Sequence, residues 1–207
     1  MSERTPFTTM SATAVVLLED NVDTDQIIPA RFLKYSRAQG YGGFLLHDRR
    51  FDADGKPISD FVLNREAARS AQILVAGANF GGGSSREGAV YALADYGIRC
   101  VVASGFGPIF YKNCFPNGIL PAKVDAADIG RLLENARDGA TRLTVDIEAS
   151  EIRNEAGYIA RFRIEPFFRE MLMLGVDEIG LTLGLKDEIA EFEKRYLCRN
   201  WHMKEAV

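Results

Sequence analysis

Three consecutive glycines, Gly81 to Gly83, separate two segments of different periodicity. The preceding ILVAGA (73–78) is a short apolar run typical of a buried strand, and the following REGAVYALADYG (86–97) has apolar residues at helical spacing. Glycine loses more conformational freedom on folding than any other residue, so this run indicates special backbone torsions or a close approach by another group. We therefore expect a strand, a glycine turn and a helix that ends at Gly97.

The neighbouring segments extend this alternation. Cys100–Ala103 is a second apolar run, Gly107-Pro108 is typical of a helix start, and Asn117-Gly118 predicts a turn into ILPAKV. We also expect a first strand over 14–19, a short helix over 64–71, a helix over 126–138, and two alternating strands, LTVDIEASEI and YIARFRI, joined at NEAG. The sequence predicts an α/β domain whose mixed, partly parallel sheet is flanked by helices.

The chain reads as one domain over residues 1–207, without internal repeats. We expect a flexible arm over residues 1–12 and a C-terminal helical extension over 166–207, with two amphipathic helices broken between Gly175 and Gly184. The N-terminal apolar run is too short for a signal peptide or for a membrane span, which needs about 20 residues.

Composition excludes several classes of function. The 25 basic and 29 acidic residues are spread along the chain, so we expect neither a nucleic-acid surface nor a membrane-binding patch. The three cysteines are far apart and form no C-x-x-C pair, which favours a reducing compartment, the cytoplasm. With two histidines and no Cys/His cluster, the sequence predicts no zinc site and no complete iron–sulfur site, so metal chemistry would come from a partner.

The segment GGGSSRE (81–87) is the first candidate site. It lacks the Lys of a P-loop and the third Gly of G-x-G-x-x-G, but a glycine turn at a helix start presents N–H groups and a positive dipole end to an anion. Ser84-x-x-Glu87 alone is a capping box, which is a structural interpretation. Arg86 in the first turn opposes the helix dipole by about 0.3–1 kcal/mol, which favours an anionic ligand beside it. Both interpretations remain open on these residues.

The second candidate is NVDTD (21–25), at the start of a long loop that contains Pro29. Its two aspartates resemble part of a calcium loop, but the sixth-position Gly and twelfth-position Glu are absent, so an Asx-type turn is favoured. Asp25 is a candidate to orient an arginine of the site, because a carboxylate and a guanidinium form paired hydrogen bonds.

Five motifs in order resemble one family over the whole chain. They are NVDTDQIIPARFLK (21–34), DFVLN (60–64), ANFGGGSSRE (78–87), the run from Ile109 to Pro121, and IGLTL (179–183). The sequence closely resembles the small subunits of 3-isopropylmalate dehydratase, relatives of the aconitase swivelling domain. The resemblance implies a swivelling β/β/α domain and a hydro-lyase of leucine biosynthesis that isomerises 2- and 3-isopropylmalate through 2-isopropylmaleate. It also implies a large subunit that carries a [4Fe–4S] cluster, in a heterodimer or heterotetramer, without which the chain is inactive.

The resemblance assigns roles to individual residues. Ser84 would be the catalytic base, acting as an alkoxide, while Ser85 and Arg86 would bind a substrate carboxylate. Thr24 and Asp25 match site residues of the family. The loop from Arg31 to Tyr35 would sense the side group of the substrate, with Arg31 and Leu33 as substrate-binding residues and the aliphatic Leu33 suited to an isopropyl group.

Two departures leave the substrate open. The family often has Cys at the position of Gly82 and His at that of Gly88. Related dehydratases for another alkyl-malate, citraconate or homoaconitate share these motifs, and Lys34 in the sensing loop keeps open a substrate with an extra carboxylate. A non-enzymatic alternative is a binding module that senses an anion at the glycine turn.

Overall fold

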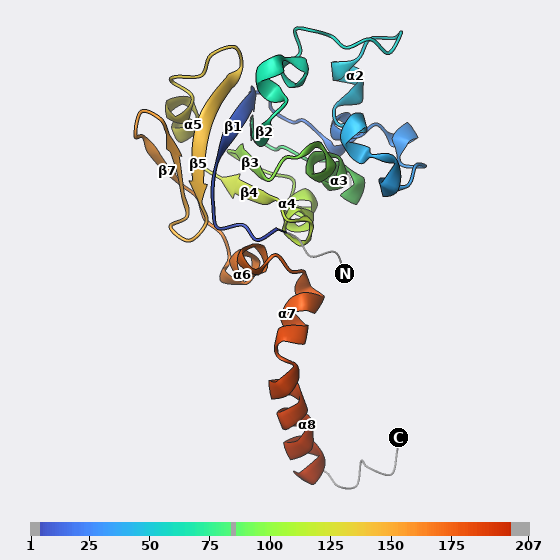
Figure 1. The fold of residues 1–207 in the computed structure, drawn as a ribbon, viewed down its shortest axis with the longest axis vertical. Helices are drawn as coiled ribbons and strands as arrows, with labels where there is room; N and C mark the ends of the chain where they lie inside the picture. Colours follow the sequence, from blue (N-terminus) through green and yellow to red (C-terminus); the bar gives the residue numbers. More distant parts are fainter. Residues whose placement is uncertain (1–4, 84–85, 200–207) are drawn as a thin grey trace.

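The computed structural model describes residues 5–83 and 86–199 (Figure 1). Within these residues, seven strands form one sheet in the order β4-β3-β2-β1-β5-β6-β7. The strands are β1 (Thr9–Leu17), β2 (Ala71–Ala76), β3 (Cys100–Ala103), β4 (Leu120–Lys123), β5 (Ala140–Asp146), β6 (Glu151–Asn154) and β7 (Ile159–Arg161).

The sheet has a parallel half and an antiparallel half that meet at β1. Strands β1 to β4 pair in parallel, with Leu17 opposite Ala76, whereas β1 pairs antiparallel with β5, with Thr9 opposite Asp146. Strands β5, β6 and β7 continue the antiparallel half. This arrangement confirms the predicted α/β fold with a mixed, partly parallel sheet.

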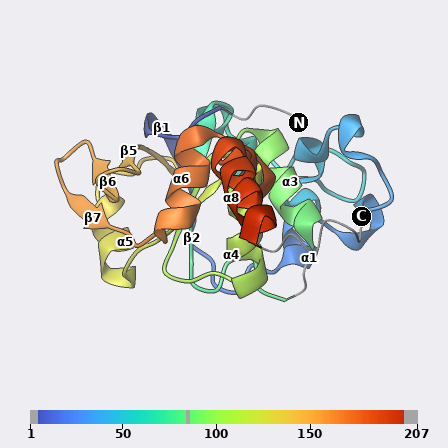
Figure 2. The same cartoon turned by 90° about the horizontal axis from the view of Figure 1, so that it is seen from below.

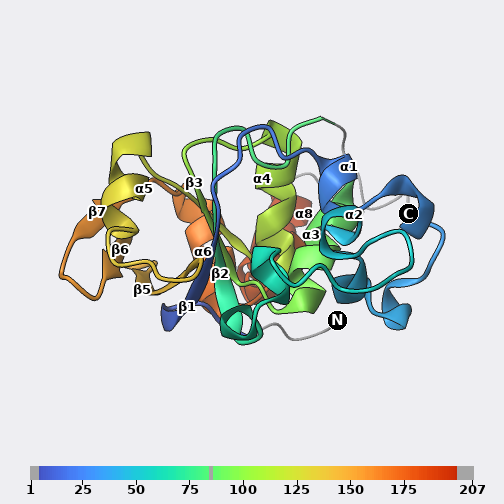
Figure 3. The ribbon, with the colours of Figure 1, turned by 90° about the horizontal axis from the view of Figure 1, so that it is seen from above.

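Helices cover the two faces of the sheet. The helices are α1 (Thr24–Ile27), α2 (His47–Arg50), α3 (Glu87–Tyr96), α4 (Pro108–Cys114), α5 (Ala126–Leu132), α6 (Pro166–Leu174), α7 (Glu178–Gly184) and α8 (Lys186–Arg199). Six 3-10 turns occur in the described parts of the chain, most of them in the loop after α1. They are η1 (Ala30–Phe32), η2 (Arg37–Gln39), η3 (Tyr41–Phe44), η4 (Val62–Asn64), η5 (Glu66–Ala68) and η6 (Phe115–Asn117). Figure 3 shows α1, α2 and α3 at one end of the molecule and β6, β7 and α5 at the other.

Alternate residues of the strands point into two hydrophobic cores, one on each face of the sheet. Leu74 and Val101 face the core that contains α3 and the loop after β1, while Val75 and Val102 face the core that contains α5 and α6. This alternation follows from the two-residue period of a strand. Because both faces of the parallel strands are buried, these strands read as continuous apolar runs in the sequence.

The ends of the chain differ from the sequence-based expectation. Strand β1 begins at Thr9 and Phe7 is buried, with its N–H bonded to the carbonyl of Leu172 at 2.8 Å, so the expected arm does not reach residue 12. The tail contains three helices up to residue 199, where the described chain ends, rather than two, because α7 forms inside the segment expected to be a break. Figure 2 shows α8 nearly end-on, in front of the domain.

Three internal predictions also need correction. LTVDIEASEI forms two strands, β5 and β6, since the chain turns at Ser150 with φ 55°. The helix expected over 126–138 ends at Leu132, and the one expected over 64–71 is replaced by short 3-10 turns. In residues 5–83 and 86–199, no helix has both the length and the apolar character that crossing a membrane requires.

Candidate functional site

The glycine turn lies at the carboxyl ends of β2 and β3. The N–H of Phe80 donates to the carbonyl of Gly105 at 3.0 Å, and the N–H of Gly107 donates back to Phe80 at 2.9 Å. At Gly81 φ is +70°, and an added Cβ would overlap the ring of Phe110. The glycines therefore allow two loops to pack at the edge of a parallel sheet where ligands commonly bind.

The NVDTD segment (21–25) runs beside this turn, although the two are far apart in sequence. The N–H of Gly81 donates to Val22 at 2.7 Å, and the N–H of Thr24 donates to Gly82 at 3.0 Å. Asp23 caps α1 by accepting from the N–H of Gln26 at 2.8 Å. The segment is thus a capped turn that holds Thr24 and its neighbour against the glycines, and Thr24 is buried.

Asp25 and Arg86 form an ion pair across the two motifs. Asp25 lies in the first turn of α1, and Arg86 is the residue immediately before α3. The side chain of Asp25 is 54% exposed, and the side chain of Arg86 is 25% exposed. Asp25 therefore pairs with an arginine, and the role of this pair in a site stays a prediction. The pair is open to solvent on the Asp25 side, whereas Arg86 Nη1 is buried.

The start of α3 differs from a capping box. The helix begins at Glu87, with Arg86 as its N-cap and no capping bond from the Arg86 side chain. Glu87 therefore occupies the first helical position, not the third position that a capping box requires. Ser84 and Ser85, the predicted base and its neighbour, lie outside the described residues.

Leu33 lies over the start of α3. A Cβ added at Gly88 would lie 2.9 Å from Leu33 Cδ2 and 3.3 Å from the ring of Tyr41. Leu33 itself is 39% exposed. Because Gly88 has no side chain, Leu33 of the predicted sensing loop packs against α3 at this position. Gly88 is two residues after Arg86 in the chain, so an aliphatic side chain lies near the Asp25–Arg86 pair.

Gly82 is in contact distance of a polar side chain. A Cβ there would lie 3.0 Å from the Asn79 side chain, which donates to the Asn21 side-chain oxygen at 2.9 Å. A larger residue at position 82 would have to displace this amide, so glycine suits the local packing.

Arg31 does not join the Asp25–Arg86 pair. Its Nη1 donates to Asp48 Oδ2 at 2.8 Å, its Nη2 contacts the other carboxylate oxygen, and its guanidinium lies 4.5 Å from the Phe32 ring centre. The hydrogen bond raises the pKa of Arg31 and lowers the pKa of Asp48. The guanidinium is bound to α2, whereas Leu33 lies over the start of α3.

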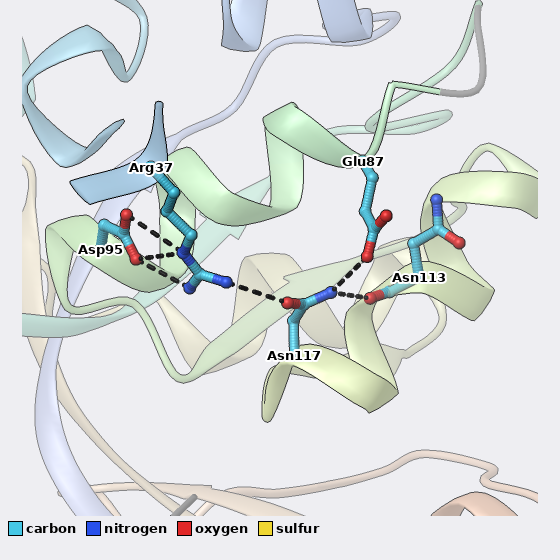
Figure 4. Close-up of polar contacts among 5 residues, drawn as sticks. All are labelled: Arg37, Glu87, Asp95, Asn113 and Asn117. Atoms are coloured by element: carbon cyan, nitrogen blue, oxygen red, sulfur yellow. Dashed lines mark hydrogen bonds and ion pairs between the residues drawn. The ribbon is translucent and has the colours of Figure 1, made fainter. Parts of the chain in front are cut away.

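A polar network that the sequence analysis missed fixes the loop along α3 (Figure 4). Arg37 donates to Asp95 from Nε at 3.0 Å and from Nη2 at 2.8 Å, and its guanidinium lies 4.4 Å from the Tyr91 ring centre. Its Nη1 also donates to Asn117, whose amide donates to Glu87 at 3.3 Å. The network links the loop to both ends of α3, and no sequence periodicity signalled it.

The described residues offer no metal site. No group of three or more His, Cys, Asp or Glu side chains within them is arranged to hold a metal ion. Cys100 and Cys114 are buried, and burial raises the pKa of both thiols, while Cys198 is exposed. These residues do not fit an iron–sulfur cluster.

The fold agrees with comparisons to known proteins. The family described as the aconitase C-terminal domain matches residues 4–127. A solved structure of 3-isopropylmalate dehydratase (leuD) from Methanocaldococcus jannaschii superposes with a TM-score of 0.63 and 26% identity, covering 90% of this chain and 99% of that one. The molecule is therefore an aconitase-type swivelling domain.

Comparison with individual related proteins identifies the family within this class. A 3-isopropylmalate dehydratase small subunit from Halalkalibacterium halodurans is 49% identical over 188 residues, covering 91% of this chain and 97% of that protein. One from Rhodopseudomonas palustris strain TIE-1 is 47% identical over 190 residues, covering 91% and 94%. The chain belongs to the family of 3-isopropylmalate dehydratase small subunits, as the five motifs predicted.

Proposed function

We propose that this chain supplies the carboxylate-binding and proton-accepting half of a 3-isopropylmalate dehydratase active site, which a large subunit completes. The complex interconverts 2-isopropylmalate and 3-isopropylmalate by loss and return of water through 2-isopropylmaleate. The main support is the Asp25–Arg86 ion pair beside the glycine turn at the carboxyl edge of the sheet. It combines a guanidinium suited to a carboxylate with a residue that orients it.

Arg86 binds a carboxylate of the substrate through paired hydrogen bonds, while Asp25 keeps the guanidinium in place. Ser85 adds a hydroxyl to the same carboxylate, and Thr24 supports the turn through its N–H bond to Gly82. Leu33 contacts the isopropyl group from the loop that packs on Gly88. Arg31 lies in the same loop and orders it, because its ion pair with Asp48 holds η1 against α2.

Ser84 is the base of the proposed reaction. In the dehydration direction its alkoxide takes a proton from a carbon of the substrate, and the hydroxyl on the neighbouring carbon leaves. A serine hydroxyl is a weak acid in water, so its alkoxide needs stabilisation by N–H groups and a cation. The glycine-rich helix start and Arg86 are the groups of this chain that supply both.

The cluster belongs to the partner in this proposal. A [4Fe–4S] cluster on the large subunit would provide the Lewis acid for the departing hydroxyl, and no group of three or more His, Cys, Asp or Glu side chains among the described residues of this chain could hold a metal ion. The free cysteines suit a reducing compartment, and we place the complex in the cytoplasm. Heterodimer and heterotetramer are both compatible with these roles.

The test is a Ser84→Ala variant assembled with the cluster-loaded large subunit under anaerobic conditions. We expect turnover of 3-isopropylmalate to fall at least about 100-fold with KM little changed, because the proton acceptor is lost and the carboxylate contacts remain. Ser70→Ala removes an exposed hydroxyl and serves as the matched control. Undiminished turnover in Ser84→Ala would overturn the assignment of the base.

The substrate is tested in the same assembled enzyme. We expect 3-isopropylmalate to have a higher kcat/KM than homoaconitate-type substrates, because Leu33 offers an apolar contact rather than a cation for a third carboxylate. We also expect it to exceed citraconate-type substrates, because their methyl group makes a smaller apolar contact. A preference for a substrate with a third carboxylate would refute this choice and point to Lys34.

A further inference from the structure

The start of α3 has no side-chain cap of its own, although the proposed function places substrate contacts there. Arg86 is the N-cap residue, and its side chain makes no capping bond. Asp25 holds the guanidinium of Arg86 and not the backbone from which the helix begins. The first turn of a helix has N–H groups without partners inside the helix. The position of this turn therefore depends on contacts from other segments.

Glu87, the first residue of α3, makes such a contact. Its carboxylate accepts a hydrogen bond from Asn117 Nδ2 at 3.3 Å, and Figure 4 shows the two side chains pointing toward each other. Burial raises the pKa of Tyr91, and a hydrogen bond to Glu87 raises it further. A carboxylate in the first helical turn is also stabilised by the helix dipole. Glu87 is thus fixed both by its own helix and by Asn117.

Asn117 is itself held in place. Its Nδ2 also donates to the Asn113 carbonyl at 2.9 Å, and its Oδ1 accepts from Arg37 Nη1 at 3.4 Å. It ends η6, in which Phe115 is buried and stacks on Phe168 with 4.2 Å between ring centres. A side chain with several bonds on an anchored turn keeps one orientation. Asn117 therefore presents a fixed donor to the start of α3.

The three partners of Asn117 together require an amide. The Glu87 carboxylate and the Asn113 carbonyl need donors, whereas the Arg37 guanidinium needs an acceptor. A primary amide carries two N–H donors and one carbonyl oxygen, so it satisfies all three. This requirement gives a chemical reason for an asparagine in the run from Ile109 to Pro121, where the sequence pattern predicted only a turn.

We propose that Asn117 is a positioning residue of the proposed active site and acts through Glu87. It fixes the first turn of α3, and with it the end of the glycine turn that carries Arg86 and the proposed base, Ser84. The inference rests on the proposed function of that turn. It differs from the role of Arg37, which fixes the loop that carries the sensing residues.

The test uses the complex with the cluster-loaded large subunit under anaerobic conditions. We expect Asn117→Ala to lower kcat about tenfold, because small displacements of reacting groups cost much of the rate. We expect KM to stay within about threefold, since Asp25 still holds the guanidinium that binds the carboxylate. Asn135→Ala removes an exposed amide in the turn after α5 and is the matched control.

An exchange of roles tests the contact itself. At about pH 8, Asn117→Asp places a second carboxylate against Glu87, and we expect a larger loss of kcat because like charges repel. Adding Glu87→Gln restores a donor and an acceptor with their positions exchanged. We expect the double variant to recover at least about threefold in kcat over Asn117→Asp. Circular dichroism and urea unfolding of each variant check that it is folded.

Three results would refute the positioning role. They are an unchanged kcat in folded Asn117→Ala, a rise in KM at constant kcat, and a double variant no more active than Asn117→Asp. A wild-type complex that does not turn over 3-isopropylmalate would instead refute the proposed function. Amide hydrogen exchange over residues 88–93 of the free chain then tests the contact. Faster exchange in Asn117→Ala than in Asn135→Ala supports it, and equal exchange refutes it.

Discussion

Gly81 is the residue of the glycine turn where backbone torsion and packing both exclude a side chain. Its φ is +70°, and a Cβ would overlap the Phe110 ring. We expect Gly81→Ala to lower the free energy of unfolding by about 2–4 kcal/mol. Gly43→Ala is the matched control, because no atom lies within 4 Å of the added Cβ. Urea unfolding measures both, and equal stabilities would contradict the close packing of this turn.

The cysteines differ in reactivity for a physical reason. Burial raises the pKa of Cys100 and Cys114, so both remain protonated thiols through neutral pH, whereas Cys198 is exposed. Only the thiolate attacks a disulfide reagent. At about pH 8 we expect one fast-reacting thiol in the folded chain and three after unfolding. Cys198→Ser should remove the fast reaction, and a fast phase that survives would show that a buried thiol is accessible.

Residue roles were predictable to different extents. The sequence predicted that Asp25 orients an arginine, because a carboxylate and a guanidinium form paired hydrogen bonds, and the structure pairs Asp25 with Arg86. It gave no reason to pair Arg31 with Asp48, since residues 36–72 have no clear periodicity and a single carboxylate carries no sequence signal.

At the scale of elements, the loop after β1 is fixed to α3 by Arg37. Removing its bonds to Asp95 and Asn117 loosens the loop that carries Leu33, so a smaller fraction of molecules is competent to bind substrate. We expect Arg37→Ala to raise KM of the assembled enzyme about three- to tenfold with kcat nearly unchanged.

Arg69→Ala is the control for this variant, because the Arg69–Glu66 pair is exposed and lies between neighbouring turns of the same segment. Steady-state kinetics of both variants measures KM and kcat, and we expect only Arg37→Ala to raise KM. A loss of kcat at constant KM in Arg37→Ala would mean that the network acts on the chemical step and not on loop order.

The parallel elements were readable from sequence, whereas the antiparallel half was predicted as two strands and the break between β5 and β6 was missed. Strands β2, β3 and β4 are buried on both faces, so they stand out as apolar runs between glycine and proline signals. The break between β5 and β6 is a short turn over 147–150, whose positive φ falls on Ser150 and not on a glycine. A residue that tolerates this torsion only through its tertiary context leaves no local signal.

At the scale of the whole molecule, three loops converge at one edge of the sheet. The loops that follow β1, β2 and β3 bring together the NVDTD segment, the glycine turn and the loop over 105–107. Asp25 at this edge is half exposed, so the Asp25–Arg86 pair stays open to a further surface. Because the chain belongs to a family of small subunits, we expect the large subunit to cover this edge and to close the site.

The most direct test is an anaerobic titration of the cluster-loaded large subunit with this chain, following formation of 2-isopropylmaleate from 3-isopropylmalate. We expect no turnover from either subunit alone and activity that rises and then saturates as the chain is added. Asp25→Asn should saturate at the same ratio but with lower turnover, because it weakens the orientation of Arg86 without touching assembly. Turnover by one subunit alone, or full activity in Asp25→Asn, would contradict a site shared between the subunits.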